Sequence, residues 1–198
     1  MKEKIVKKAS DLFLKFGFKS ITMDDIASEM CISKKTIYKY FANKEVLIEE
    51  ATVSVHNEIQ SKIEEIQNKN HNAIEENFVI KQMFTDMFQS TETSPVYQLK
   101  KHYPEIYATV KVQQETICMS MFERNLQNGI LQDLYRKEIP VTTFVNFYYN
   151  LIFMINENYQ FESEIEILER QALEYHLRAI VSPKGLVELE KNLNNPIT

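Results

Sequence analysis

Three lysines and two tyrosines lie within residues 32–41, in a chain of 198 residues whose formal net charge is −5. Ammonium groups and phenolic hydroxyls donate hydrogen bonds to phosphate oxygens, and donors near the start of a helix can also reach the edges of bases. Residues 1–45 contain ten lysines and six acidic residues, so this segment carries +4 and the rest of the chain carries −9. Because lysine and arginine drive nucleic-acid binding by neutralising phosphates, this division predicts that only the N-terminal segment contacts a polyanion.

Two short helices are predicted ahead of this basic stretch. Apolar residues recur within residues 5–16 at the spacing of one helix face, and Gly17 follows as a stop. A second helix should begin after Thr22, because Thr22 and Asp25 have the spacing of a capping box, in which a hydroxyl and a carboxylate satisfy free backbone N–H groups.

A third helix, residues 34–41, should follow Ser33, which is a favourable N-cap residue. Ile37 and Phe41 are four residues apart and should face the core. The residues predicted to point outward are Lys34, Lys35, Thr36, Tyr38 and Lys39, with Tyr40 at the edge. Three short helices with this break form the helix-turn-helix pattern, whose second helix enters the DNA major groove. The alternative is an ordinary exposed helix whose lysines only aid solubility.

The sequence ITMDDIASEMCISKKTIYKYFANKEVLI, residues 21–48, resembles the DNA-binding region of the TetR family of bacterial transcriptional repressors, and the resemblance extends over about residues 5–50. It implies phosphate contacts by Thr22, Ser33, Tyr38, Tyr40 and Lys44. It implies groove contacts by Lys34, Lys35, Thr36 and Lys39.

Two positions depart from the family pattern. The turn usually has a glycine where Cys31 stands, so either Cys31 adopts a left-handed conformation at a cost of about 1 kcal/mol, or the turn has another shape. Lys35 occupies a position that is often small, and it could add a contact to a base or a phosphate. The target sequence of a relative therefore cannot be transferred to this chain.

The remaining residues predict a larger helical domain. We expect domains at residues 1–46 and 47–198, since the length exceeds one minimal core but is short for two full-sized domains. The expected helices span residues 46–68, 73–89, 106–126, 141–158, 164–181 and 186–193. Strand-like alternation is absent from the sequence, which contains only three glycines, so the predicted fold is all-α.

The segment 141–158 is apolar around most of its circumference, and such a helix must be buried on more than one side. A homodimer would supply the second side and would place two recognition helices on a palindromic operator. In the family, the last two long helices form the dimer interface, and residues 141–158 and 164–181 resemble that pair. The alternative is a monomer with a large central helix.

The family resemblance also implies a small-molecule effector, hydrophobic or amphipathic, in the C-terminal domain. Methionine and aromatic residues make adaptable walls of apolar cavities. The candidates are Met83, Phe84, Met87, Phe88, Tyr97, His102, Tyr103, Met119, Phe122, Phe147 and Tyr148. The same residue types at helical spacing also form plain cores, so a DNA-binding protein without an effector is the alternative.

Motifs for other functions are missing from the sequence. An all-α enzyme is disfavoured because there is no Glu-x-x-His pair, HExxH, GxSxG, phosphate-binding glycine loop or paired CxxC motif. We expect no cofactor and no metal. Cys31 and Cys118 match no disulfide or metal pattern, and the apolar segment 144–155 falls short of the roughly 20 residues of a membrane span. We therefore expect a cytoplasmic, non-enzymatic regulator that binds double-stranded DNA, a second copy of itself and an effector.

Overall fold

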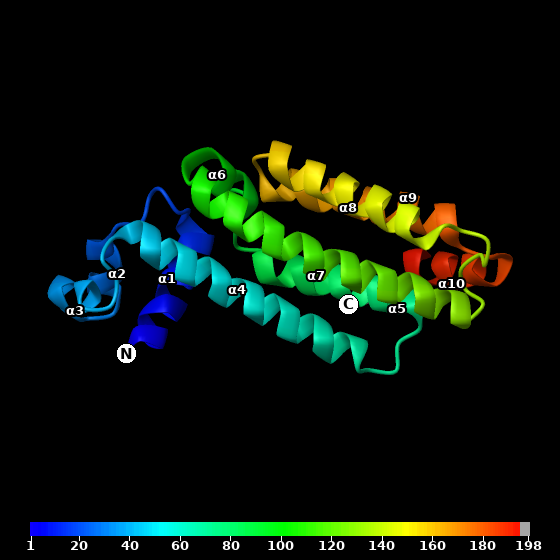
Figure 1. Cartoon of the computed structure of the whole chain (residues 1–198), viewed down its shortest axis with the longest axis horizontal. Helices are drawn as coiled ribbons and strands as arrows, with labels where there is room; N and C mark the ends of the chain where they lie inside the picture. Colours follow the sequence, from blue (N-terminus) through cyan, green and yellow to red (C-terminus); the bar gives the residue numbers. More distant parts are fainter. Residues whose placement is uncertain (195–198) are drawn as a thin grey trace.

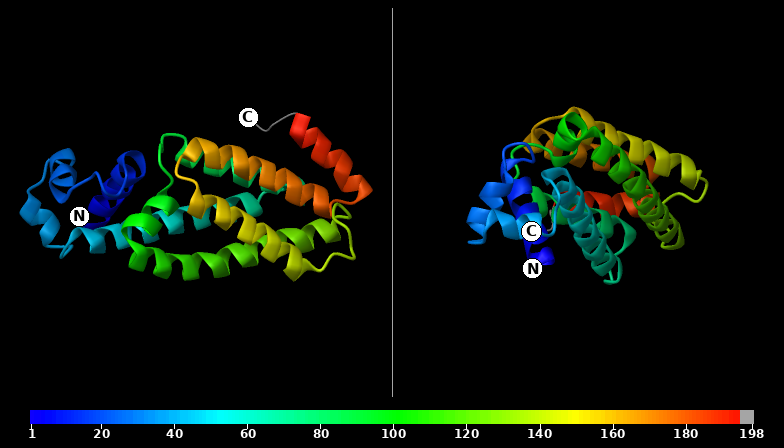
Figure 2. Two further views of the ribbon diagram at one scale, coloured as in Figure 1. Left: turned by 90° about the horizontal axis from the view of Figure 1, so that it is seen from above. Right: turned by 60° about the vertical axis from the view of Figure 1, so that its left-hand side comes forward.

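The computed structural model describes residues 1–194, and α-helices are the only regular secondary structure in that range (Figures 1 and 2). In chain order the helices are α1 (Lys2–Phe16), α2 (Met23–Glu29), α3 (Lys34–Tyr38), α4 (Lys44–Gln67), α5 (Ala73–Phe88), α6 (Pro95–His102), α7 (Pro104–Leu131), α8 (Val141–Asn158), α9 (Glu162–Ile180) and α10 (Pro183–Asn194). Two isolated bridges pair Thr93 with Phe161 and Tyr135 with Val181. The all-α prediction is confirmed.

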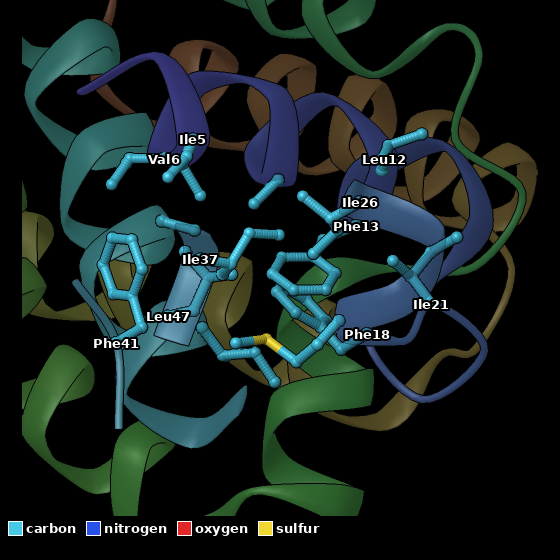
Figure 3. Packing of buried hydrophobic residues seen from close by; sticks show 14 of the residues in the cluster. Ile5, Val6, Leu12, Phe13, Phe18, Ile21, Ile26, Ile37, Phe41 and Leu47 are labelled. Carbon is cyan, nitrogen blue, oxygen red and sulfur yellow. The ribbon is translucent and has the colours of Figure 1, made fainter. Parts of the chain in front are cut away.

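Helices α1, α2 and α3 and the first turns of α4 form a small N-terminal domain, called the head below. Its apolar core contains Ile5 and Phe13 from α1, Ile26 from α2, Ile37 from α3 and Leu47 from α4 (Figure 3). Each of these side chains is at most 1% exposed. Burial of this one cluster fixes α3 against the other helices of the head, because α3 is too short to be stable alone.

Helix α4 connects the head to the remaining helices, called the body below. It has 24 residues, which at 1.5 Å per residue gives a length of about 36 Å. Its start is capped by Asn43, whose Oδ1 accepts the Val46 N–H at 2.9 Å. The predicted domain boundary between residues 46 and 47 therefore falls inside a continuous helix whose Leu47 belongs to the head core.

The body is a bundle around α5, which packs against α4, α7, α9 and α10. Helix α8 packs against α7 and α9, so that α8 and α9 form one flank of the molecule (Figure 1). A second apolar core lies between these helices and includes Ile74, Leu126, Leu177 and Leu189, each at most 1% exposed. Head and body thus each have their own core.

A polar network is buried where α5 begins. The Tyr135 hydroxyl lies 3.1 Å from both the Ala73 carbonyl oxygen and Asn125 Oδ1. Asn125 Nδ2 donates to the Ala73 carbonyl at 2.9 Å and to Glu76 Oε1 at 2.8 Å, while Asn77 Nδ2 donates to Asn125 Oδ1 at 2.8 Å. Complete burial raises the pKa of Tyr135, so it remains a neutral hydrogen-bond donor. The network ties α5 to α7 and to the loop that follows α7.

Helix α8 has the predicted bounds, Val141–Asn158. Val145, Tyr148 and Ile155 are buried on one face, whereas Phe147 and Met154 are exposed on the other.

Among residues 1–194, every helix is too short or too polar to cross a lipid bilayer.

The largest difference from the predicted elements is α6, a helix of eight residues that was not predicted. Ser94 caps it and Pro95 is its first residue, while Pro104 is the first residue of α7. Proline is tolerated at this position because the first N–H of a helix has no partner within the helix. The two prolines therefore start helices, and the break between α6 and α7 is short. Smaller differences are that α9 begins at Glu162 and α10 at Pro183, both earlier than predicted.

Candidate nucleic-acid interface and ligand cavity

The turn between α2 and α3 is a Schellman motif centred on Cys31, which has φ 53°. The Cys31 N–H donates to the Ser28 carbonyl at 3.0 Å, and the Ile32 N–H donates to the Ala27 carbonyl at 3.0 Å. These are the two bonds that satisfy the last carbonyls of a helix before a left-handed residue. Of the two alternatives for this turn, the left-handed cysteine is the one that the structure contains.

Replacing Cys31 with glycine is expected to stabilise the protein by about 0.5 kcal/mol, because relief of the left-handed strain exceeds the entropic cost of a glycine. The Cys31 side chain is exposed, so little packing is lost. Thermal unfolding should show a slightly higher Tm for Cys31→Gly. Cys31→Ala is the matched control, since it removes the thiol and retains the strain. An equal gain in both variants would mean that the thiol, not the backbone, causes the instability.

Helix α3 ends at Tyr38, three residues earlier than predicted. Lys39 and Tyr40 form a turn, in which the Tyr40 N–H and the Phe41 N–H both donate to the Ile37 carbonyl, at 2.9 and 3.1 Å. Phe41 is 0% exposed and anchors this turn in the head core. The predicted burial of Ile37 and Phe41 is confirmed, and the helix tightens at its end to reach both positions.

The outer face of α3 presents a mixture of free and engaged side chains. Lys34 Nζ donates to Asp24 Oδ2 at 2.8 Å, and this bond raises the pKa of Lys34. Ser33 Oγ accepts the Thr36 N–H at 3.1 Å and lies 2.8 Å from Thr36 Oγ1, so these two hydroxyls complete the cap. Lys35 is exposed and has no ion pair within residues 1–194.

The remaining predicted contacts surround α3. The hydroxyls of Tyr38 and Tyr40 belong to exposed side chains, as does the ammonium group of Lys39. Lys44 lies at the start of α4, where partial burial lowers its pKa, and its Nζ donates to the Lys19 carbonyl at 3.3 Å. Thr22 Oγ1 donates to Asp25 Oδ2 at 2.7 Å and accepts the Asp25 N–H, as the capping box predicts.

Helices α2 and α3 and the start of α4, which carry these residues, lie at one end of the long axis of the molecule, away from the body (Figure 1). Helix α3 and the turn that follows it thus present lysine and tyrosine side chains toward solvent. Such a surface can bind phosphates through several donors at once and place α3 side chains against base edges.

A cavity of about 370 Å³ lies between head and body. Its walls come from α1, α4, α5, α6, α7, α8 and the first half of α9. About half of the wall residues are apolar or aromatic and about half are polar, so the cavity offers a small organic molecule both apolar contacts and groups that can orient it.

Four of the eleven predicted ligand-binding residues line this cavity: Phe84, Phe88, Phe122 and Tyr148. The other seven, which lie outside its walls, are Met83, Met87, Tyr97, His102, Tyr103, Met119 and Phe147. Helix geometry explains the division on α5, because Met83 and Met87 directly precede Phe84 and Phe88 and therefore point about 100° away.

Different surroundings explain the other five positions. Tyr103 packs against the head core, Met119 packs against the body core, and Phe147 is 65% exposed. His102 is exposed. The ammonium group of Lys101 lies over the Tyr97 ring, with its Nζ 5.3 Å from the ring centre.

Several cavity residues were not predicted from sequence. Phe13 and Leu14 come from α1, His56 and Ile59 come from α4, and three glutamates come from α9. The apolar period of α4 indicates a buried face, but no local signal shows that this face borders a cavity and not a core.

The cavity lies next to a hydrogen-bonded link between head and body. Gln98 of α6 is 8% exposed, and its Oε1 accepts the Phe18 N–H at 2.9 Å. Its Nε2 donates to the Thr93 carbonyl at 2.9 Å. Gly17, with φ 87°, makes room for this side chain, since a Cβ there would lie 2.6 Å from Gln98 Oε1. Displacement of α6 would therefore be transmitted to the loop after α1.

A helix-turn-helix head, a continuous connecting helix and a helical body, with a cavity between head and body, define the class of two-domain helix-turn-helix proteins. Residues 5–51 match the family described as "Bacterial regulatory proteins, tetR family". This match covers the head, which therefore has the DNA-binding region of the tetR family of bacterial regulatory proteins.

Two relatives are HTH-type transcriptional regulators. The chain is 38% identical over 64 residues to the uncharacterised HTH-type transcriptional regulator YhgD of Bacillus subtilis, covering 32% of this chain and 34% of that one. It is 25% identical over 134 residues to IcaR of Staphylococcus aureus, the negative transcriptional regulator of the biofilm operon icaADBC, covering 68% of this chain and 63% of that one. Both alignments span less than two thirds of the relative.

Two crystal structures share the fold across almost their whole length. A transcriptional regulator from Cytophaga hutchinsonii superposes with a TM-score of 0.73 at 19% identity, covering 91% of this chain and 98% of the other. Reduced NemR of E. coli superposes with a TM-score of 0.71 at 14% identity, covering 92% and 98%. At these identities the likeness concerns the fold.

Proposed function

We propose that this protein is a homodimeric transcriptional repressor that binds a palindromic DNA operator through α3 and is released by a small hydrophobic or amphipathic effector. It would act in the cytoplasm, without enzymatic activity. The observation that carries the proposal is the uncovered face of α3 and the turn after it, where Lys35, Tyr38 and Lys39 are exposed and Ile37 anchors the helix in the head core. Repression is supported by the similarity to IcaR, a negative regulator.

The proposed contacts divide into two groups by position. The groove contacts are Lys34, Lys35, Thr36 and Lys39, on α3 and the turn that follows it. The phosphate contacts are Thr22, Ser33, Tyr38, Tyr40 and Lys44, around its edge. Lys34 can leave Asp24 at little cost, because the ion pair is exposed and water screens it.

Dimerisation is proposed through α8 and α9. Apolar side chains remain exposed on both helices, and an uncovered apolar surface of this kind marks an interaction site. They are Phe147, Met154, Ile167 and Tyr175, exposed by 65%, 48%, 51% and 72%. A two-fold axis through this flank would present two heads to two operator half-sites.

Release by an effector is supported by the walls of the cavity. A ligand there would touch α1 of the head and both α4 and α6, the two elements that join head to body. The ligand would weaken DNA binding only if it bound more tightly to a conformation in which the spacing of the two heads does not match the operator. Such coupling between two sites typically changes affinity by about 5- to 150-fold. The cavity also favours this function over a DNA-binding protein without an effector, for which a solid core was expected.

The decisive experiment is a fluorescence anisotropy titration of the purified protein against labelled DNA from upstream of its own coding region, at two salt concentrations. Random DNA of equal length is the control. Tight binding with clear preference over random DNA would support the proposal. Only weak, fully salt-sensitive binding, both there and after selection from randomised sites, would contradict it.

Lysines of the two groups should respond differently to alanine substitution. Lys44→Ala should weaken binding to all DNA sequences alike and reduce the slope of log affinity against log salt by about 1. Lys35→Ala should instead change the preference between bases at one operator position, by about 1–3 kcal/mol of binding free energy. Lys62→Ala is the matched control, since Lys62 pairs with Glu58 on the part of α4 that lies in the body. A changed preference with an unchanged salt slope in Lys44→Ala would show that the roles are assigned wrongly.

A further inference from the structure

The cavity walls carry an excess of negative charge. Four carboxylates line the cavity, from Glu76 on α5 and from Glu162, Glu166 and Glu169 on α9. Lys81 is the one lysine among the wall residues, and no arginine is present. His56 also lines the cavity, but burial lowers its pKa, so it adds no positive charge near neutral pH.

The lysine is already neutralised by one of these carboxylates. Lys81 Nζ lies 2.7 Å from Glu169 Oε2, and both side chains are largely buried. Asn156 Nδ2 donates to the other oxygen of Glu169 at 2.7 Å. Within the described part of the chain, neither Glu162 nor Glu166 forms an ion pair. The wall therefore has two carboxylates without an ion pair, of which Glu162 is partly buried and Glu166 is exposed.

The position of these carboxylates relative to the apolar walls gives the chemistry of a matching ligand. Glu162, Glu166 and Glu169 are spaced at i, i+4 and i+7, so they share one face of α9, toward the cavity. Aromatic rings form much of the remaining wall, including Phe84 and Phe88, which stack with ring centres 6.3 Å apart. The faces of aromatic rings and carboxylate oxygens both attract a weakly hydrated cation.

We propose that this cavity selects an organic cation with a bulky apolar body, of the lipophilic ammonium or phosphonium class, whose charge lies beside Glu162 and Glu166. Binding itself is independent of the proposed function; only its effect on DNA affinity rests on that function. An apolar anion of the same shape would face the unpaired carboxylates and would be rejected.

Tetraphenylphosphonium and tetraphenylborate test this directly, because they have nearly the same size and shape and opposite charges. Isothermal titration calorimetry of the full-length protein at pH 8 should show affinity for the cation at least about tenfold higher than for the anion. Glu162→Gln and Glu166→Gln should each weaken cation binding about 5- to 10-fold. Glu65→Gln, an exposed position of α4 outside the cavity walls, is the matched control and should leave binding unchanged.

The cation affinity should also depend on pH in a defined direction. Burial, with Glu169 and Glu166 nearby, raises the pKa of Glu162 to about 7, and Lys81 only partly opposes this. Glu162 is therefore mostly neutral at pH 6 and mostly ionised at pH 8, so the wild type should bind the cation more tightly at pH 8. This difference should shrink in Glu162→Gln, because the carboxyl group whose ionisation causes it is then absent.

Equal affinity for the two ions, stronger binding of the anion, or no binding of either would overturn the inference. Titration of the same preparations against operator DNA separates this from the proposed function. Specific DNA binding without cation selectivity would refute only the cavity chemistry. Cation selectivity without specific DNA binding would refute only the proposed function, and lowered DNA affinity in the presence of the cation would join the two.

Discussion

Replacement of Phe147 with glutamate is expected to disrupt the proposed dimer and to lower operator affinity by roughly 100-fold or more. A monomer has one head and therefore loses the gain in affinity from binding two half-sites at once. The fold should persist, because Phe147 is 65% exposed on α8 and makes little contact within its own chain. In a dimer the introduced carboxylate would be buried against apolar residues of the partner flank, where a lone charge is strongly unfavourable.

Sedimentation velocity and anisotropy titration check this prediction together. Phe147→Glu should sediment as a monomer under conditions where the wild type is a dimer. Val187→Glu is the matched control, as Val187 is 73% exposed on α10, a helix outside the proposed interface. A Phe147→Glu protein that remains dimeric and binds the operator normally would place the interface elsewhere.

The second large effect is expected at Gly129 in α7. An added Cβ would lie 2.0 Å from Cδ2 of the Tyr135 ring. The ring has no room to withdraw, because Tyr135 is 1% exposed and its hydroxyl is held by the Ala73 carbonyl and Asn125. Gly129→Ala should therefore lower the free energy of unfolding by about 3 kcal/mol, at the upper end of the range for overpacked cores.

Urea unfolding measures this change, and its sign is decisive. Helix propensity alone would make alanine about 1 kcal/mol more favourable than glycine within α7. A more stable Gly129→Ala protein would thus mean that Tyr135 is not packed against this position. Ser120→Ala, at an exposed position of the same helix, should change stability by less than about 0.5 kcal/mol.

The head was largely predictable from sequence because short-range interactions determine it. The capping box of Thr22 and Asp25 and the N-caps Ser33 and Asn43 each involve residues three apart. Even the left-handed Cys31 was one of two stated alternatives. The end of α3 was the exception, since its last turn tightens to bury Phe41 in the tertiary core.

The cavity and the exposed flank were less predictable because they depend on which helices meet. Phe147 and Tyr148 are adjacent aromatic residues of α8, yet one is exposed and the other lines the cavity. A helix that is apolar on most sides does not indicate which side faces solvent. Glu162, Glu166 and Glu169 likewise have the pattern of a solvated helix face, and only the packing of α9 beside α5 brings them to the cavity.

The bond between Phe18 and Gln98 restricts how this protein can be recombined with its relatives. The Phe18 N–H belongs to the head, whereas Gln98 follows it by eighty positions, and Leu99 beside it packs in the head core. A chimera cut in α4 would therefore separate the head from part of its own core. Grafting this head onto a foreign body requires residues 93–107 to be transplanted with it, because Ile106 and Tyr107 also pack against the head core, so the unit of exchange is discontinuous in sequence.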